Sequence, residues 1–154
     1  MRRSAFQLIG LAVFLIAVEP ANASKPKIEG EISGVELCPQ VACGAAIFTG
    51  TFQGKVGNDS TPGFFWASVQ HEPLPVDPNQ SAVVLGGKWS LSTFRGQFRG
   101  SVIDGFITNN GDNTFTVTLT LQLKRGGKGL LIAEVVLDHN DFPPTAEGKL
   151  FQPE

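Results

Sequence analysis

Residues 114–124 alternate polar and apolar side chains, and this pattern constrains the fold more than any other part of the chain. Phenylalanine, valine or leucine occupies every second position, with threonine or glutamine between them. A period of two predicts a β-strand with one face in a core and the other in water. Residues 109–112 and 125–129, which flank it, are rich in the glycine and asparagine that hairpin turns require. The pattern predicts a three-stranded antiparallel meander over residues 97–138.

Other runs of valine, isoleucine, phenylalanine and threonine, bounded by turn-forming residues, predict further strands. These runs cover residues 27–37, 45–56, 64–70, 82–85, 89–94 and 147–151. No segment has a convincing helical pattern. An open sheet of so many strands would expose edges and an apolar face, so the strands must close or form two layers. The predicted fold class is all-β, a small antiparallel barrel of about eight strands, with a two-sheet β-sandwich as the alternative.

A G-x-F-x-G-x-V pattern occurs twice, at residues 50–56 and 96–102. Its glycines and phenylalanine share one face of a strand, so Phe52 and Phe98 are predicted to be buried inside the barrel, at equivalent places on paired or symmetry-related strands. The glycines are expected where strands bend or approach closely. His71 and His139, each followed by prolines, extend the repeat at unequal spacing. An internal duplication and the independent origin of similar barrel strands both explain it.

The N-terminal residues have the pattern of an export signal. Arg2 and Arg3 precede an apolar run at residues 8–18, and small residues lead to Ala23. The run is shorter than the roughly 20 residues of a membrane-spanning helix. The domain prediction is a signal peptide at residues 1–23 and a single all-β domain at residues 24–154. The mature chain is expected in the periplasm or outside the cell.

The charge balance gives little support for a nucleic-acid or membrane partner. The chain has 12 basic and 14 acidic residues, and losing Arg2, Arg3 and Glu19 with residues 1–23 would leave 10 and 13. No basic cluster is present in the sequence, so neither nucleic acid nor an anionic membrane surface is predicted as a partner. Tyrosine is absent and the best strand lacks aromatic girdles, which argues against membrane insertion of the mature chain as an integral barrel.

Cys38 and Cys43 are the only cysteines. In an exported chain this pair predicts an intramolecular disulfide. The spacing is not the C-x-x-C of redox proteins, and the local sequence lacks the partners of a zinc site. We therefore predict neither a metal nor a cofactor.

His71 and His139 are the only histidines, and both have acidic neighbours. They could meet at one barrel mouth as metal ligands or as an acid–base pair, with Asp141 as a third candidate catalytic residue. The alternative interpretation is that both histidines are polar residues at strand ends before a proline-containing turn. The structural interpretation is favoured because no motif fixes a catalytic geometry.

Large aromatic side chains supply candidate ligand-binding residues. Residues 63–66, GFFW, form the densest aromatic cluster, in which Phe64 and Trp66 share a face and Phe65 points away. An eight-stranded barrel is either filled by side chains or holds one small ligand. We expect Phe64, Trp66, Trp89 and Phe115 to contribute to an apolar site inside the barrel.

Other enzyme signatures are absent from the sequence. The serines lack a G-x-S-x-G setting, no glycine-rich phosphate loop is present, and no alternation of strands and helices supports dinucleotide binding. The predicted function is non-catalytic: binding of a small apolar ligand, or a structural role in the cell envelope or outside the cell. The alternative is an enzyme whose site contains His71, His139 and nearby carboxylates. The sequence does not determine the oligomeric state.

Overall fold

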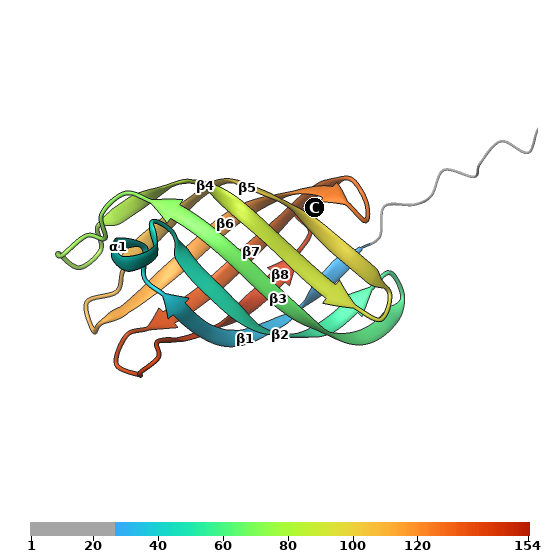
Figure 1. The fold of residues 1–154 in the computed structure, drawn as a ribbon, viewed down its shortest axis with the longest axis horizontal. Coiled ribbons are helices and arrows are strands. Elements are labelled where there is room, and N and C mark those ends of the chain that lie inside the picture. Colours follow the sequence, from blue (N-terminus) through green and yellow to red (C-terminus); the bar gives the residue numbers. More distant parts are fainter. Residues whose placement is uncertain (1–26) are drawn as a thin grey trace, which may run out of the picture.

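Eight antiparallel strands close into a barrel in residues 27–154, the part of the chain that the computed structural model describes (Figure 1). The strands follow one another round the barrel in chain order, and β8 pairs with β1 to close it. The elements are β1 (Ile28–Cys38), α1 (Gln40–Cys43), β2 (Ala46–Val56), β3 (Asp59–His71), β4 (Ser81–Thr93), β5 (Gly96–Asn109), β6 (Thr114–Arg125), β7 (Gly129–Asp138) and β8 (Thr145–Phe151).

The closed sheet confirms the predicted all-β barrel and excludes the two-sheet alternative. The predicted signal peptide at residues 1–23 lies outside the described residues. Two details differ from the sequence prediction: α1 is a single helical turn, and β4 is one strand where the sequence predicts two. The two predicted runs join through Gly86 and Gly87, next to an irregularity in the pairing with β3. Over residues 27–154, no helix has the length and apolar character needed to cross a membrane.

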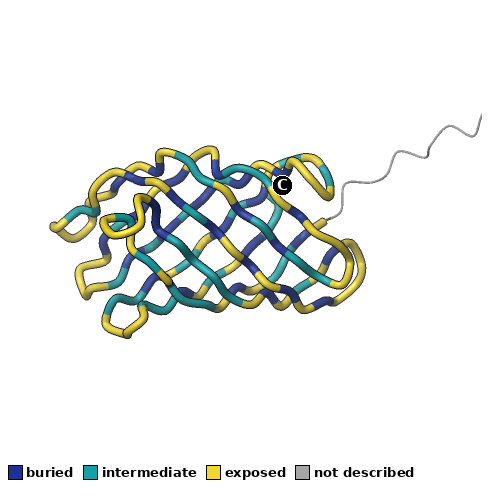
Figure 2. The backbone as a smooth tube through the Cα atoms, viewed as in Figure 1, coloured by how far each residue is buried: buried dark blue, intermediate teal, exposed yellow. Residues whose placement is uncertain are grey.

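The core fills the barrel with side chains from alternate positions of each strand. Figure 2 shows buried and exposed positions alternating along the strands. In β6 the inward face follows the predicted pattern, with every apolar residue from Phe115 to Leu123 buried. The largest fully buried side chains are Trp89, Phe52, Ile28, Leu91, Leu121, Leu131, Leu150 and Val69.

The prediction that Phe52 and Phe98 are buried is confirmed. Phe52 fits because Gly54 pairs with Gly30 across β1 and β2, and neither has a side chain. A Cβ placed on Gly54 would lie 2.5 Å from the Cα of Gly30 and 2.6 Å from the Phe52 ring. The two glycines therefore let the strands approach closely and leave room for the ring.

The strand order separates the two parts of the sequence repeat. Phe52 and Phe98 lie on β2 and β5, which are three strands apart and run in opposite directions. A duplication of half of an eight-stranded barrel would instead relate β2 to β6. His71 ends β3 and His139 follows β7, so these two residues do fit a shift of four strands. The prediction that the phenylalanines occupy symmetry-related strands is therefore wrong, although both are buried.

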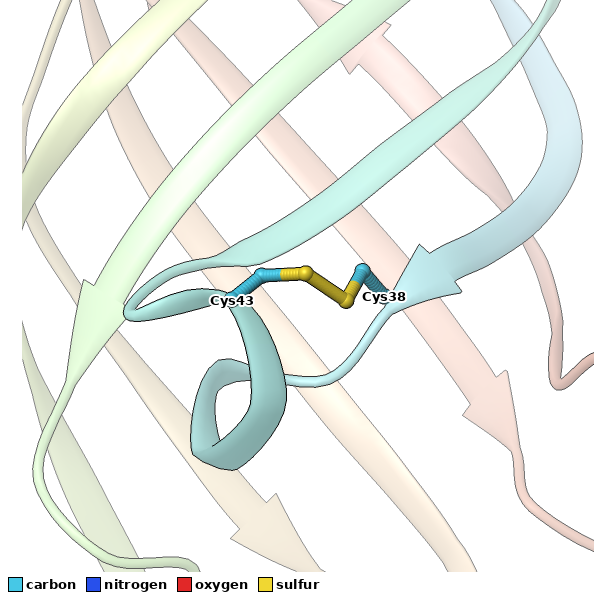
Figure 3. Close-up of a disulfide and its surroundings, with 2 residues drawn as sticks. All are labelled: Cys38 and Cys43. Carbon is cyan, nitrogen blue, oxygen red and sulfur yellow. A yellow bond between two sulfur atoms is a disulfide. The ribbon is translucent and has the colours of Figure 1, made fainter.

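The predicted disulfide between Cys38 and Cys43 is present (Figure 3). It joins the end of β1 to the end of α1, across Cα atoms 6.1 Å apart. Gly44 ends the helical turn in the left-handed region, at φ 73°, and its N–H donates a 2.7 Å hydrogen bond to the Gln40 carbonyl. The crosslink holds α1 against β2 and β3. Such disulfides are typical of oxidising compartments.

Candidate functional site at one mouth of the barrel

The four odd-numbered strands run to the same end of the barrel, where α1 and the loops after β3, β5 and β7 lie (Figure 1). Each of these strands has an inward-facing polar residue at this end: two residues before the end of β1, at the last position of β3 and of β5, and directly after β7. We call the four residues the polar mouth; they are Glu36, His71, Asn109 and His139.

The sequence analysis identified the two histidines of the polar mouth but neither Asn109 nor Glu36, which is central to it. On β1 the inward face includes Ile28 and Ile32, and Glu36 follows at the same spacing. Its side chain is therefore carried into the barrel, and the residue is only 6% exposed. The signal was available, because counting by twos from Ile28 reaches an acidic residue at an inward position.

Glu36 and His139 form the central contact of the mouth. His139 Nε2 lies 3.3 Å from Glu36 Oε2, a distance suited to an ion pair when the imidazole is protonated. This buried nitrogen makes no aligned hydrogen bond with any described residue. The His139 ring also packs against Phe115, with ring centroids 5.0 Å apart. The backbone N–H of Glu36 donates a 2.9 Å hydrogen bond to the Pro144 carbonyl, so the β7–β8 loop contacts Glu36 twice.

The surroundings of Glu36 raise the pKa of its carboxyl. Burial raises the pKa of the Glu36 carboxyl above its ordinary value, because a low-dielectric environment disfavours the charged form. Nearby His139 and His71 lower the same pKa, but they offset the effect of burial only in part. Glu36 therefore holds a proton more readily than an exposed glutamate does.

The helical turn that the disulfide closes holds His71. Gln40 accepts a 2.7 Å hydrogen bond from the backbone N–H of His71 through Oε1, and its Nε2 donates a 2.6 Å hydrogen bond to the His71 carbonyl. The ring Nδ1 lies 2.6 Å from the Glu72 carbonyl oxygen. Because a carbonyl oxygen only accepts, Nδ1 carries a proton and donates it. In the neutral ring Nε2 is then the free acceptor.

Asn109 has a clear structural role. Its Nδ2 donates hydrogen bonds of 2.9 and 3.0 Å to the carbonyls of Pro75 and Val76, and its Oδ1 accepts one of 2.8 Å from the Gly111 N–H. Asn109 thus ties the β3–β4 loop to the end of β5. Its side-chain amide thus makes three of the four hydrogen bonds that it can form.

The two predicted histidines do lie at one mouth, on either side of Glu36. Their strands, β3 and β7, are each separated from β1 by one strand in the barrel. The third predicted candidate, Asp141, is exposed, and its Oδ2 accepts a 2.9 Å hydrogen bond from Thr145 Oγ1. Asp141 therefore orders its own loop and does not contact the Glu36–His139 pair. Within residues 27–154, no three histidine, cysteine or acidic residues are grouped so as to hold a metal ion.

The aromatic candidates do not form one interior site. Trp89 and Phe115 are buried, as expected for inward residues. Phe64 is 73% exposed and Trp66 37% exposed on the outer face, so the prediction that they point into the barrel is wrong. On β3 the inward-facing positions are those of Phe65, Ala67 and Val69, which are all buried. Their outward-facing neighbours include the two exposed aromatic residues.

A small apolar cavity lies beside the polar mouth. Its volume is about 30 Å³, roughly the share of liquid volume that one water molecule takes. Gly34, two residues before Glu36, and Phe48, which pairs with Glu36, both line it. The other lining residues are Ile32, Thr49, Phe65, Ala67, Val117, Leu119, Ala133, Val135 and Ala146. The rest of the interior is filled by the buried side chains of the core.

Together, the fold and the site define a closed eight-stranded meander barrel with a filled apolar interior and a polar mouth built around a buried glutamate. Comparison of the chain with protein families, curated proteins and solved structures gives no match.

Proposed function

We propose that the protein is an exported, non-catalytic binding barrel, located in the periplasm or outside the cell, whose polar mouth holds a small ligand with a short apolar part. The buried carboxyl of Glu36 carries this proposal. Among the described residues, no hydrogen bond reaches this carboxyl beyond the approach of His139. The buried side-chain atom without a hydrogen-bond partner is His139 Nε2, 3.3 Å from this carboxyl; an unpaired buried polar group destabilises a fold, so the arrangement of the pair needs another explanation.

The contrast with Asn109 supports a functional explanation. Asn109 is buried at the same mouth, and its side chain makes three hydrogen bonds to loops. The Glu36 side chain makes no comparable hydrogen bond to a loop, although its backbone N–H donates one to the Pro144 carbonyl. Its carboxyl is therefore free to accept a hydrogen bond from a bound molecule.

The surroundings of Glu36 define the chemistry of the ligand. An ionised carboxylate only accepts hydrogen bonds, so it favours a head group that donates, such as a hydroxyl or an amine. The adjacent cavity is apolar and holds only a group about the size of a methyl or a water molecule. Half-buried Phe48 forms one wall of that cavity, and a longer apolar part would require its side chain to move.

Export rests on two observations of different kinds. The disulfide between Cys38 and Cys43 is typical of oxidising compartments. The pattern of residues 1–23 independently predicts a signal peptide. Intact-mass measurement of the product from the periplasm or the medium of the expressing cells tests both, since the mature chain should begin near Ser24.

A titration followed by amide NMR tests the binding proposal. The probes are 1-propanol and n-propylamine, with propionate as the anionic counterpart. We expect shifts centred on Glu36, Phe48 and His139 with the two donor probes and much weaker shifts with propionate. Glu36→Leu should abolish them, whereas Glu31→Gln, a change at an exposed position of the same strand, should leave them unchanged. Identical shifts in the Glu36→Leu variant would rule out the mouth as the site.

A second candidate function is acid–base catalysis at the same mouth. The specific observation is the raised pKa of the buried Glu36 carboxyl between two histidines, since perturbed ionisable groups cluster at active sites. Hydrolysis of p-nitrophenyl acetate, compared with free imidazole, provides a first assay. Catalysis that is lost in both Glu36→Gln and His139→Ala, while both variants stay folded, would favour an enzyme over a binding protein.

A further inference from the structure

Basic residues from three strands meet on the outer face of the barrel, away from the polar mouth. The pairing register places Trp66 on β3, Ser90 on β4, Arg99 on β5 and Arg125 on β6 in one row across the sheet. This row lies in a groove of about 430 Å³. The residues that line it are Trp66, Lys88, Trp89, Ser90, Arg99, Gly100, Ser101, Lys124 and Arg125.

The groove is strongly cationic on a chain with a net charge of −2. Four of its lining residues are lysine or arginine, and none is acidic. Over residues 27–154, the ion pairs formed by lysine and arginine involve Lys27 and Arg95, neither of which lines the groove. Its four cations are therefore available to a ligand.

Trp66 gives the groove a flat apolar surface beside these charges. Its side chain points outward, and the residue is 37% exposed. Trp89 lies beneath, buried, and its indole N–H donates a 3.2 Å hydrogen bond to the Gln122 carbonyl. Gly100 pairs with Trp89 across β4 and β5 and leaves room for its ring, because a Cβ at Gly100 would lie 3.1 Å from the indole Nε1. The floor is thus fixed by packing, while the Trp66 ring stays accessible.

We propose that this groove binds an acidic saccharide, a chain of sugars that carries carboxylate or sulfate groups. The planar guanidinium groups of Arg99 and Arg125 can each hold such an anion through two parallel hydrogen bonds. The Trp66 ring can contact the apolar face of a sugar, and the hydroxyls of Ser90 and Ser101 can bond to sugar hydroxyls. The row spans three strand spacings, about 14 Å, which suits a short oligosaccharide better than a single ion.

A single-stranded nucleic acid is the alternative occupant, and the observations favour it less. Proteins of that kind stack successive bases on several aromatic side chains along a basic groove. Here one exposed indole lines the groove. The overall acidic chain would also repel a long polyanion beyond the groove itself.

Calorimetric titration of the folded protein with a heparin hexasaccharide tests the proposal. Maltohexaose serves as the neutral saccharide and a 20-nucleotide oligo-dT as the nucleic acid. We expect the heparin hexasaccharide to bind, maltohexaose not to bind, and oligo-dT to bind more weakly. The double variant Arg99→Gln, Arg125→Gln should lose about tenfold or more in affinity, because charge-assisted hydrogen bonds are lost.

Matched variants separate a specific site from general charge. The double variant Lys55→Gln, Lys149→Gln removes the same charge from exposed positions on β2 and β8 and should change the affinity less than about twofold. Trp66→Ala should weaken binding of the hexasaccharide, and Glu36→Leu at the mouth should not. An equal loss in both double variants, tighter binding of oligo-dT, or no binding of the hexasaccharide would overturn the proposal.

Discussion

His139 Nε2 and Glu36 Oε2 lie 3.3 Å apart at one mouth of the barrel, although Glu36 is on β1 and His139 follows β7, far apart in the chain. Closure of the barrel makes the contact, because β8 pairs with both β1 and β7. One histidine and one glutamate are thereby joined in a low-dielectric environment. The first two predictions concern this pair.

Replacing Glu36 by glutamine should make the stability of the protein depend differently on pH. The folded-state pKa of Glu36 is raised above the ordinary 4.5, so its contribution to stability is fully present below that value and is lost as pH rises through the folded-state pKa. Glu36→Gln should therefore gain stability relative to the wild type as pH rises from 4 toward 7. Urea denaturation at a series of pH values measures the difference. A relative loss in the variant over this range would contradict the raised pKa.

Removing the imidazole of His139 should raise the pKa of Glu36 further. A protonated His139 stabilises the nearby carboxylate by its charge, and His71 acts through its charge with a smaller effect than that of His139. We expect a larger increase in His139→Gln than in His71→Gln. Carbon-13 NMR of the Glu36 side-chain carboxyl, followed against pH, gives both values. Equal pKa values in the wild type and His139→Gln would show that the contact has no electrostatic effect.

Truncating either of the repeated phenylalanines should strongly destabilise the barrel. Phe52→Ala and Phe98→Ala each leave a cavity at a fully packed site, which typically costs about 3 to 5 kcal/mol. Phe94→Ala provides the control, because Phe94 is 90% exposed, and its effect should stay within about 0.5 kcal/mol. Chemical denaturation compares the unfolding free energies of the three variants, provided that the dependence of this free energy on denaturant concentration is the same in each. A loss below about 1 kcal/mol at position 52 or 98 would argue against tight packing there.

Loss of the disulfide should loosen the mouth as well as lower stability. Changing Cys38 and Cys43 together to serine removes a short crosslink whose entropic contribution is about 2 kcal/mol. Because Gln40 lies inside the crosslinked loop and bonds to the backbone of His71, exchange of the His71 amide hydrogen should accelerate. Gln40→Ala, which keeps the disulfide, should accelerate the same exchange with a smaller loss of stability. An unchanged exchange rate of the His71 amide hydrogen in the double serine variant would show that the disulfide does not stabilise the mouth.

Several features of the fold could be predicted from local patterns in the sequence. The alternation in residues 114–124 predicted the strand that became β6, and the spacing of two cysteines predicted their disulfide. The G-x-F-x-G frame predicted two buried phenylalanines. These predictions succeed because period two and short crosslinks depend on residues close together in the chain. The inward position of Glu36 belongs to the same class, although the sequence analysis did not identify it.

Other features depended on the closed barrel. GFFW contains adjacent aromatic residues, so alternation alone left open whether Phe65 or its neighbours point inward, and packing of the whole β3 face decided it. The sequence shows no basic cluster because its lysines and arginines are scattered, yet the register of β4, β5 and β6 gathers four of them in one groove. The contact between Glu36 and His139 likewise requires β8 to close the sheet. For strands with a regular alternation, such as β6, local sequence was enough to identify the apolar face. Strand order, direction and register, which depend on the chain as a whole, determined which polar and charged residues meet.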